Sequence, residues 1–387
     1  MSRLFLKIAA FAAALLAAPL AAAQTISTPL QVRTGDVFTV NVDYTQSADI
    51  GGQEMNATMA YVYSIHVLDA EQRLWRFMPV SVSYQLPEAP GIDPAAANVN
   101  WPVMSDMMSA MMRMATDVGF DCRVDEYGRC LDMTNWPLWS ARLENMALAF
   151  DAGARMFPGN RSTADIAVEE DGAPKRGDVG GMSAAPNWET LRGPVMAGVA
   201  RMIDSFDSRD AASSMGSVYL PAYVQGRTLT RRETVQVVDE YEMPFGAPAL
   251  RYTGTLRLDS IDRRANTATI TRRSQLDEAS ARAAIDAMTA FVSETLIEPL
   301  APHFPEGQTP PDGTALAQAI NSLLVDFDYE DTTRGVVDLT TGMARETVTD
   351  NTMTARITSS DQPMTTRGRI ITRVTPAAPN LPRLPRP

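Results

Sequence analysis

The sequence contains few of the side chains that carry out most catalytic and metal-binding chemistry. Among its 387 residues are two histidines and two cysteines, and the only lysines are Lys7 and Lys175. It lacks the H-E-x-x-H and paired C-x-x-C patterns of zinc sites, the G-x-S-x-G turn of hydrolases and the glycine-rich loops that bind phosphate. We therefore predict no catalytic residue, no metal site and no cofactor.

Long hydrophobic runs are confined to the N-terminus. A basic segment with Arg3 and Lys7 precedes an apolar segment over residues 8–20, and alanines follow. This order is typical of a signal peptide, and the run is shorter than the roughly 20 residues that a membrane-spanning helix needs. We predict a signal peptide over residues 1–23, cleavage near Ala23, no transmembrane segment, and a mature protein that is periplasmic or secreted.

Positive charge is outnumbered by negative charge, and the formal net charge is -12 at pH 7. An acidic surface repels the phosphates of nucleic acids, so we predict that the protein binds no nucleic acid. The same repulsion disfavours electrostatic binding to anionic membrane surfaces.

Cys122 and Cys130 are separated by seven residues, and two cysteines in an exported protein are expected to form a disulfide. Closing so small a loop stabilises the folded state by roughly 2.5 kcal/mol in the chain-entropy model. We expect residues 122–133 to form a hairpin. The cysteines lie directly opposite each other if Val124 faces Gly128, and they are offset if Gly128 sits in a bulge, so both registers stay open.

Alternating apolar residues predict antiparallel strands in both halves of the chain. The alternation covers residues 35–44, 59–67 and 80–86, and then residues 225–230, 252–259 and 268–272. Such period-two runs separated by turn residues are typical of antiparallel meanders. A helix capped by Asp277 follows the second meander, as a methionine-rich helix follows the first. We predict an α+β fold in which curved antiparallel sheets, built from a duplicated meander, pack on interposed helices.

The predicted organisation has two units joined by a linker. The boundaries are residues 24–158 for the first unit, 159–187 for a flexible linker, 188–375 for the second unit and 376–387 for a disordered proline-rich tail. In the second unit we expect a short helix with Pro194 at its start. The final strands are expected at residues 325–330, 335–339, 344–349, 352–357 and 367–374, with turns at Thr341-Gly342 and Asp350-Asn351.

The candidate ligand-binding residues form a methionine stripe on the first helix. They recur at i, i+3, i+4, i+7 and i+8, which places them on one helical face: Met104, Met107, Met108, Met111 and Met112. Thioether sulfur is a soft ligand that suits Cu(I), but methionine also packs flexibly in cores and grooves. The helix after Asp277 carries ordinary hydrophobic residues at the equivalent positions, which favours packing over metal binding.

Other polar residues give weaker signals. His66 lies within an expected strand and His303 in a loop, and structural roles are expected for both. The acidic run over residues 326–331 resembles the start of a calcium loop but lacks its glycine and its final glutamate, which favours a solvated strand face. An acidic chain offers many carboxylate pairs of the kind that glycosidases use, and the sequence selects none of them.

Several short motifs resemble a known kind of protein. They are Tyr127-Gly128-Arg129, Asn135-Trp136-Pro137, Leu220-Pro221 ahead of Gly226, and the Thr340-Thr341-Gly342 turn. With the signal peptide they are similar to uncharacterised bacterial envelope proteins that have duplicated meander and helix units. The layout also resembles, more loosely, periplasmic lipoprotein carriers, and that resemblance implies a curved sheet that clasps helices around an apolar cavity. The lipidated cysteine of many relatives of those carriers is missing here.

Three functional hypotheses follow from these observations. The first is a non-enzymatic exported protein that binds an apolar small molecule or an envelope protein. The second is a carboxylate-based hydrolase. The third is a Cu(I)-binding protein that uses the methionine stripe. The sequence leaves the oligomeric state open.

Overall fold

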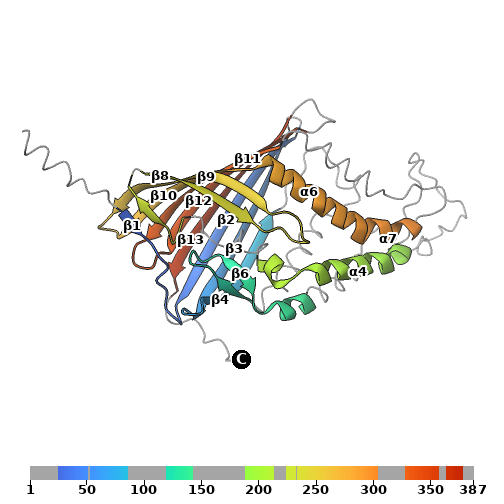
Figure 1. The fold of residues 1–387 in the computed structure, drawn as a ribbon, viewed down its shortest axis with the longest axis horizontal. Helices are drawn as coiled ribbons and strands as arrows, with labels where there is room; N and C mark the ends of the chain where they lie inside the picture. The colour runs from blue at the N-terminus through green and yellow to red at the C-terminus, as the bar shows by residue number, and fades with distance from the viewer. Residues whose placement is uncertain are drawn as a thin grey trace, which may run out of the picture.

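The computed structural model describes residues 25–50, 53–85, 119–142, 188–212, 224–231, 233–303, 327–356 and 363–377. Eleven strands form one antiparallel sheet in the order β6-β5-β4-β3-β2-β13-β12-β11-β10-β9-β8. Their bounds are β2 Val37–Ile50, β3 Gln53–Asp69, β4 Leu74–Gln85, β5 Phe120–Val124, β6 Cys130–Met133, β8 Thr234–Tyr241, β9 Leu250–Asp262, β10 Thr267–Leu276, β11 Phe327–Asp338, β12 Ala344–Arg356 and β13 Pro363–Pro376. The sheet is strongly curved (Figure 1). β1 (Thr25–Ser27) and β7 (Thr228–Thr230) form a separate two-stranded sheet.

The first and last parts of the chain meet in the middle of the large sheet. β13 pairs with β2, so that Val374 lies opposite Val40 and Ile370 opposite Tyr44. Meanders β2–β3–β4 and β8–β9–β10–β11 therefore belong to one continuous antiparallel sheet. The mainly antiparallel, curved architecture agrees with the predicted class. The duplication of the two meanders stays a prediction.

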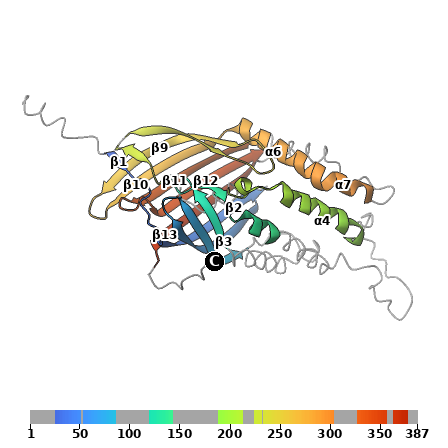
Figure 2. The same cartoon turned by 60° about the horizontal axis from the view of Figure 1, so that its bottom comes forward.

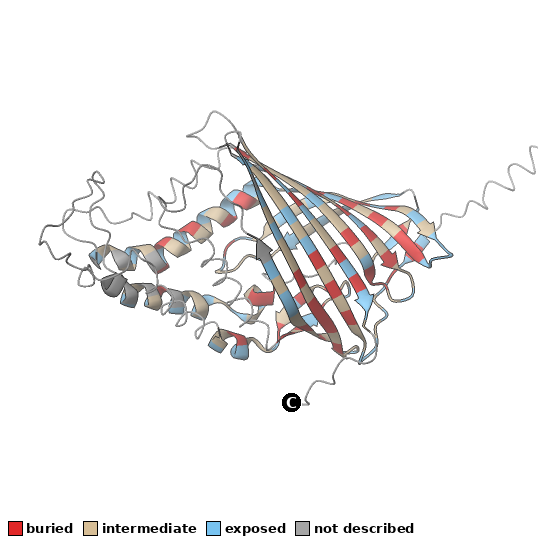
Figure 3. Ribbon diagram, turned by 180° about the vertical axis from the view of Figure 1, so that it is seen from behind, coloured by how far each residue is buried: buried red, intermediate tan, exposed pale blue. Residues whose placement is uncertain are grey.

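Side chains alternate between the two faces of the sheet, as the sequence pattern predicts. Phe38, Val40 and Val42 are at most 5% exposed, whereas the residues between them are half-buried. Buried residues alternate with exposed ones along the strands on the face seen in Figure 3. The buried set points to the concave side, where it packs against Trp139 and Ala212 from the segments that cross that side.

The buried side chains form two clusters. The aromatic core comprises residues of β2 to β6 and their contacts, with Phe38, Tyr61, Tyr63, Trp75, Phe77, Phe120 and Trp139 among them. The aliphatic core lies under β9 to β12 and consists of Ile26, Val224, Leu229, Leu256, Leu258, Ala268, Ile270, Val337 and Ala344. Both cores lie on the concave side of the sheet.

Two long helical segments lie side by side and extend beyond one end of the sheet (Figure 2). α6 (Glu278–Val292) continues through the π-helical turn η4 (Ser293–Ile297), α7 (Glu298–Leu300) and η5 (Ala301–His303). α4 (Trp188–Ser205) packs against η4 and α7. Arg201 Nη2 donates a hydrogen bond to the carbonyl oxygen of Thr295 at 2.9 Å, which joins the two segments. The pair therefore holds together largely by its own contacts.

The start of α6 matches the sequence prediction, and the start of α4 does not. Asp277 caps α6, because its side chain accepts a hydrogen bond from the Ser280 amide. α4 begins at Trp188, which places Pro194 inside the helix rather than at its start. A proline in that position removes one backbone donor from the helix.

The last strands are longer than predicted. β11 runs without a break from Phe327 to Asp338, and β12 from Ala344 to Arg356, so Asp350-Asn351 is part of a strand and not a turn. The predicted turn at Thr341-Gly342 is confirmed, with Gly342 at a φ of 71°. The signal peptide, the methionine stripe and the linker over residues 159–187 lie outside the described residues, as does the tail after residue 377.

Candidate functional site

One part of the concave face carries apolar side chains that the rest of the protein covers only in part. Met59 lies opposite Tyr44 across β2 and β3, and Tyr44 lies opposite Ile370 across β2 and β13. Tyr329 pairs with Met353 across β11 and β12. We call the following half-buried set the open concave face: Tyr44, Met59, Tyr252, Tyr329, Met353 and Ile370.

Three tyrosines connect the open concave face with one edge of the sheet. The ring of Tyr241 on β8 contacts Tyr252 on β9 edge to face at 5.2 Å, and Tyr252 contacts Tyr329 on β11 at 6.0 Å. Burial raises the pKa of all three phenols above the ordinary value. Phenols are uncharged at neutral pH even with the ordinary pKa of about 10, so the three rings themselves carry no charge.

A buried polar cluster lies next to these tyrosines. Arg272 donates from Nη1 to Asp331 Oδ1 at 3.2 Å and from Nη2 to Asp239 Oδ2 at 2.9 Å. Ser274 donates from Oγ to Asp331 Oδ2 at 2.6 Å. Burial raises the pKa of Asp331, while Arg272 and Ser274 oppose that rise. Because both oxygens of Asp331 have partners, the cluster is best explained as a structural ion-pair network rather than a catalytic carboxylate pair.

A cavity of about 650 Å³ lies between the two edges of the sheet and is lined from both of them. We call it the edge cavity. One wall comes from the hairpin of β5 and β6, one from residues 208 and 209, and one from the end of β8. Its lining residues are Arg123, Arg129, Cys130, Leu131, Asp132, Ser208, Arg209, Glu240, Tyr241 and Glu242.

At one end of the edge cavity, a segment before β7 ties the edges together. Gln225 is fully buried; its Nε2 donates to the carbonyl of Tyr127 at 2.6 Å, and its Oε1 accepts from the amide of Ala344 at 3.2 Å. The guanidinium of Arg227 lies 4.1 Å above the ring of Tyr127 and 3.7 Å from the carboxylate of Asp239. This segment therefore links the β5–β6 turn to the other half of the sheet.

A second set of contacts ties the edges together through the segment after α4. Ser208 Oγ donates to Asp132 Oδ1 at 2.6 Å. Phe206 meets Phe245, which follows β8, edge to face at 4.8 Å, and Phe245 stacks on Phe291 of α6 at 4.3 Å. Within the described ranges, side-chain contacts rather than strand pairing therefore join the two edges of the sheet.

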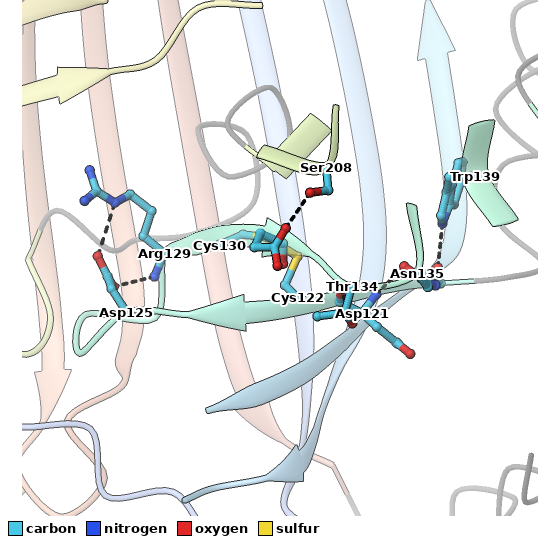
Figure 4. Close-up of a disulfide and its surroundings, with 11 residues drawn as sticks. Asp121, Cys122, Asp125, Arg129, Cys130, Thr134, Asn135, Trp139 and Ser208 are labelled. Atoms are coloured by element: carbon cyan, nitrogen blue, oxygen red, sulfur yellow. Dashed lines mark hydrogen bonds and ion pairs between the residues drawn. A yellow bond between two sulfur atoms is a disulfide. The ribbon is translucent and has the colours of Figure 1, made fainter. Parts of the chain in front are cut away.

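The disulfide fixes the hairpin that forms one wall of the edge cavity. Cys122 and Cys130 are bonded, with 5.4 Å between their Cα atoms (Figure 4). Cys122 lies opposite Met133 and Val124 lies opposite Cys130, because the register shifts by one residue at Leu131. The offset arrangement is therefore correct, but the extra residue is in β6 and not at the turn glycine.

Hydrogen bonds from the residues after β6 hold the base of this hairpin. Asn135 accepts through Oδ1 from the Asp121 amide at 3.0 Å and donates through Nδ2 to the carbonyl of Gly119 at 3.1 Å. Trp139 Nε1 donates to the same carbonyl at 2.7 Å, and its ring stacks on Phe120 at 4.1 Å. Figure 4 shows Asn135 and Trp139 beyond the disulfide, on the side away from Asp125 and Arg129. These hydrogen bonds fix the base of the β5–β6 hairpin, which forms one wall of the edge cavity.

Most of the residues that the sequence indicates as functional are not among the residues that define the edge cavity or the open concave face. The stripe of Met104, Met107, Met108, Met111 and Met112 lies outside the described residues, so its roles in ligand and Cu(I) binding stay predictions. His66 on β3 shares a hydrogen bond of 2.9 Å with Ser64, and burial and the nearby Arg76 lower its pKa, which fits a structural role. Within the described residues, no three His, Cys, Asp or Glu side chains are arranged to hold a metal ion.

Comparisons with known proteins give little further guidance. No family model and no curated protein matches the sequence. A solved structure titled "Lipid-protein interactions in lipovitellin" matches with 6% identity and a TM-score of 0.38, covering 89% of this chain and 26% of the lipovitellin chain. A similarity this weak does not establish a shared fold. In the part of the chain that the structure describes, no helix is long and apolar enough to cross a membrane.

Proposed function

We propose that this protein is an exported binding protein that holds an apolar or amphiphilic small molecule on the open concave face. The observation that carries the proposal is the contrast within one face of the sheet. Tyr63 and Ile65 of β3 are 1% exposed, whereas Met59 on the same strand and face is half-buried. Apolar surface left accessible in a concave site is typical of a ligand pocket.

The chemistry of the open concave face suits an uncharged hydrocarbon group. It consists of thioether, aliphatic and phenol side chains, and burial further raises the pKa of the Tyr252 and Tyr329 phenols, which are neutral at pH 7. Helix α6 adds further accessible apolar surface, since Ile285, Met288 and Phe291 are only half-buried. A flexible methionine such as Met353 adapts to hydrocarbon groups of different shape.

The disulfide and the predicted signal peptide also support the proposal, because both favour an exported protein. A disulfide between Cys122 and Cys130 is stable in an oxidising compartment and rare in the cytosol. Together with the predicted signal peptide it favours the periplasm or the extracellular space. An apolar molecule that crosses such an aqueous compartment needs a protein to cover it.

A matched pair of substitutions tests the proposal. Ile370 lies on the open concave face, and its neighbour Ile371 points to the opposite face of β13 with a similar, intermediate exposure. We expect Ile370→Gln to weaken binding of a fluorescent fatty-acid probe about tenfold, and Ile371→Gln to leave it unchanged. Urea unfolding of both variants controls for stability. Equal effects of the two substitutions, or absence of probe binding to the unmodified protein, would overturn the proposal.

A further inference from the structure

We infer that the edge cavity binds the zwitterionic headgroup of an amphiphile, a phosphate ester that also carries an ammonium group. This inference rests on the proposed function and extends it, because the acyl chain of the same ligand would lie on the open concave face. The cavity volume of about 650 Å³ falls in the range of roughly 300–1,000 Å³ that small-molecule sites occupy.

The charges around the edge cavity are balanced in number but not paired with one another. Of the residues that the structure describes, three arginines and three carboxylates line it, and no lysine or histidine does. Arg129 is paired with Asp125 at 3.2 Å, outside the set of lining acids. Asp132 accepts the hydrogen bond from Ser208. Arg129 among the lining cations and Asp132 among the lining anions therefore already have partners within the protein.

The remaining charged groups are exposed and available to a ligand. Arg123 and Arg209 form no ion pair with any described residue, and the same holds for Glu240 and Glu242. Two guanidinium groups favour a phosphate, to which arginine binds through paired N–H donors. Two carboxylates favour an ammonium group. A ligand that carries both charges meets both sets, whereas a purely anionic one faces two repelling carboxylates.

Tyr241 connects the headgroup site with the open concave face. Its side chain lines the edge cavity, and its ring contacts Tyr252, which in turn contacts Tyr329. These rings lead from the charged rim to apolar surface, and the charges of Arg272 and Asp331 beside them are already paired with each other. A molecule with a polar head and an acyl chain matches that order of environments.

Three single-chain lipids separate the contributions of head and chain. They share a myristoyl chain: lysophosphatidylethanolamine is zwitterionic, lysophosphatidylglycerol is anionic, and monomyristoylglycerol is uncharged. Using the full mature chain and isothermal titration calorimetry below the critical micelle concentrations, we expect the zwitterion to bind about tenfold more tightly than either of the others. Equal affinity of all three lipids would overturn the headgroup inference and leave the proposed function standing. Failure of all three to bind would count against the proposed function itself.

Paired variants identify the responsible residues. Arg123→Gln with Arg209→Gln should weaken binding of both phospholipids about tenfold, and Glu240→Gln with Glu242→Gln should weaken only the zwitterion. Monomyristoylglycerol binding should not change in either case.

Two surface residues provide matched controls for these variants. Arg334 lies on the outer face of β11 and Glu71 in the β3–β4 turn, both exposed and away from the edge cavity. Arg334→Gln and Glu71→Gln should bind all three lipids normally. If the glutamate pair has no effect on the zwitterion, the cavity binds phosphate alone and the zwitterion inference is wrong. If the control variants match the cavity variants, the effect is one of overall charge and the inference is likewise wrong.

Discussion

The two cores differ in the side chains that fill the concave side of the sheet: one is largely aromatic and the other is aliphatic. In the aromatic core, large rings such as Trp75, Phe77 and Phe120 reach across the concave side and fill it. The aliphatic core contains no aromatic residue, and smaller side chains leave space that Gln225 and the cluster around Arg272 occupy. Each aromatic ring buries about 150–250 Å², so few of them are needed to close a curved face.

The difference has a consequence for where a ligand fits. Apolar packing dominates the aromatic core, to which Met343 and Val374 of the second half also contribute, and the disulfide adds a covalent constraint at its edge. The second half depends on ion pairs whose partners come from β8, β10 and β11. The open concave face lies between these regions. Met59 and Ile370 pack against the aromatic core with part of their surface accessible, and Tyr252 and Tyr329 lie beside Arg272 and Asp331.

Removing Arg272 should have the largest effect on stability. Arg272→Met leaves Asp331 buried without its cation, while Asp239 keeps Arg227 at 3.7 Å, and breaking a buried pair in this way costs about 3–5 kcal/mol. Urea unfolding measures the loss. Burial raises the pKa of Asp331 and Arg272 opposes that rise, so without Arg272 this carboxyl takes up a proton more readily and the destabilisation should become smaller as the pH is lowered.

Arg373 provides the matched control for this prediction. It pairs with Asp43 and Glu346 on the outer surface, where its own side chain is 47% exposed. Exposed pairs contribute about 0–1 kcal/mol, so Arg373→Met should have little effect. Similar losses in the two variants would show that the second half of the sheet does not depend on its buried charges.

Loss of the disulfide should have an intermediate effect, concentrated in the first half. Replacing Cys122 and Cys130 by serine removes a constraint of about 2.5 kcal/mol in the chain-entropy model. Hydrogen exchange should speed up in β5 and β6 and stay unchanged in β9 and β10. Uniform acceleration across the sheet would contradict the separation of the two halves. The unmodified protein treated with reductant should reproduce the result.

The smallest effect is expected at the β11–β12 turn. Burial alone raises the pKa of Asp338, but hydrogen bonds from Arg345 and from the amides of Thr340 and Thr341 outweigh burial and lower it. The folded state therefore prefers the charged form. This contribution is fully present above the unfolded pKa of about 4 and is lost as the pH falls through the folded value.

Asp338→Asn should consequently cost about 1 kcal/mol at pH 7, which is typical of the loss of one hydrogen-bonding group. The difference between the variant and the unmodified protein should shrink below pH 4. Thermal unfolding at pH 7 and pH 3 gives both values. A difference that grows on acidification would show that this carboxylate does not stabilise the turn.

Strand positions with regular alternation could be predicted from the sequence, and those interrupted by turn-forming residues could not. The run that ends at Tyr44 predicts a strand because its apolar residues alternate strictly. Residue type predicts a turn at Asp350-Asn351, yet these two residues lie inside β12, where Asn351 faces the glycine at position 368. Buried polar residues such as Thr333 looked like breaks in β11 for the same reason. The residues that pair with these polar side chains lie on other strands, so the sequence around each position does not predict them.

The candidate site depends on register and curvature, which a single sequence does not reveal. Arg272 and Asp331 are 59 residues apart and meet only because β10 pairs with β11. The walls of the edge cavity come from strands at opposite ends of the strand order. Among the lining residues, the sequence pointed to Cys130 through its disulfide and to Arg129 through the motif Tyr127-Gly128-Arg129. The exposed charges of Arg123 and Glu240 gave no local signal that they share a cavity.

Photocrosslinking tests the central proposal most directly. The full mature protein is incubated with a palmitate analogue that carries a diazirine at the end of its chain, and the mixture is irradiated. Mass spectrometry of the peptides then locates the adducts. The proposed binding mode predicts adducts on Tyr44, Tyr329, Met353 and Ile370, which share the open concave face. Adducts on outward-facing residues of the same strands, such as Val348 and Ile371, or no specific adduct at all, would contradict it.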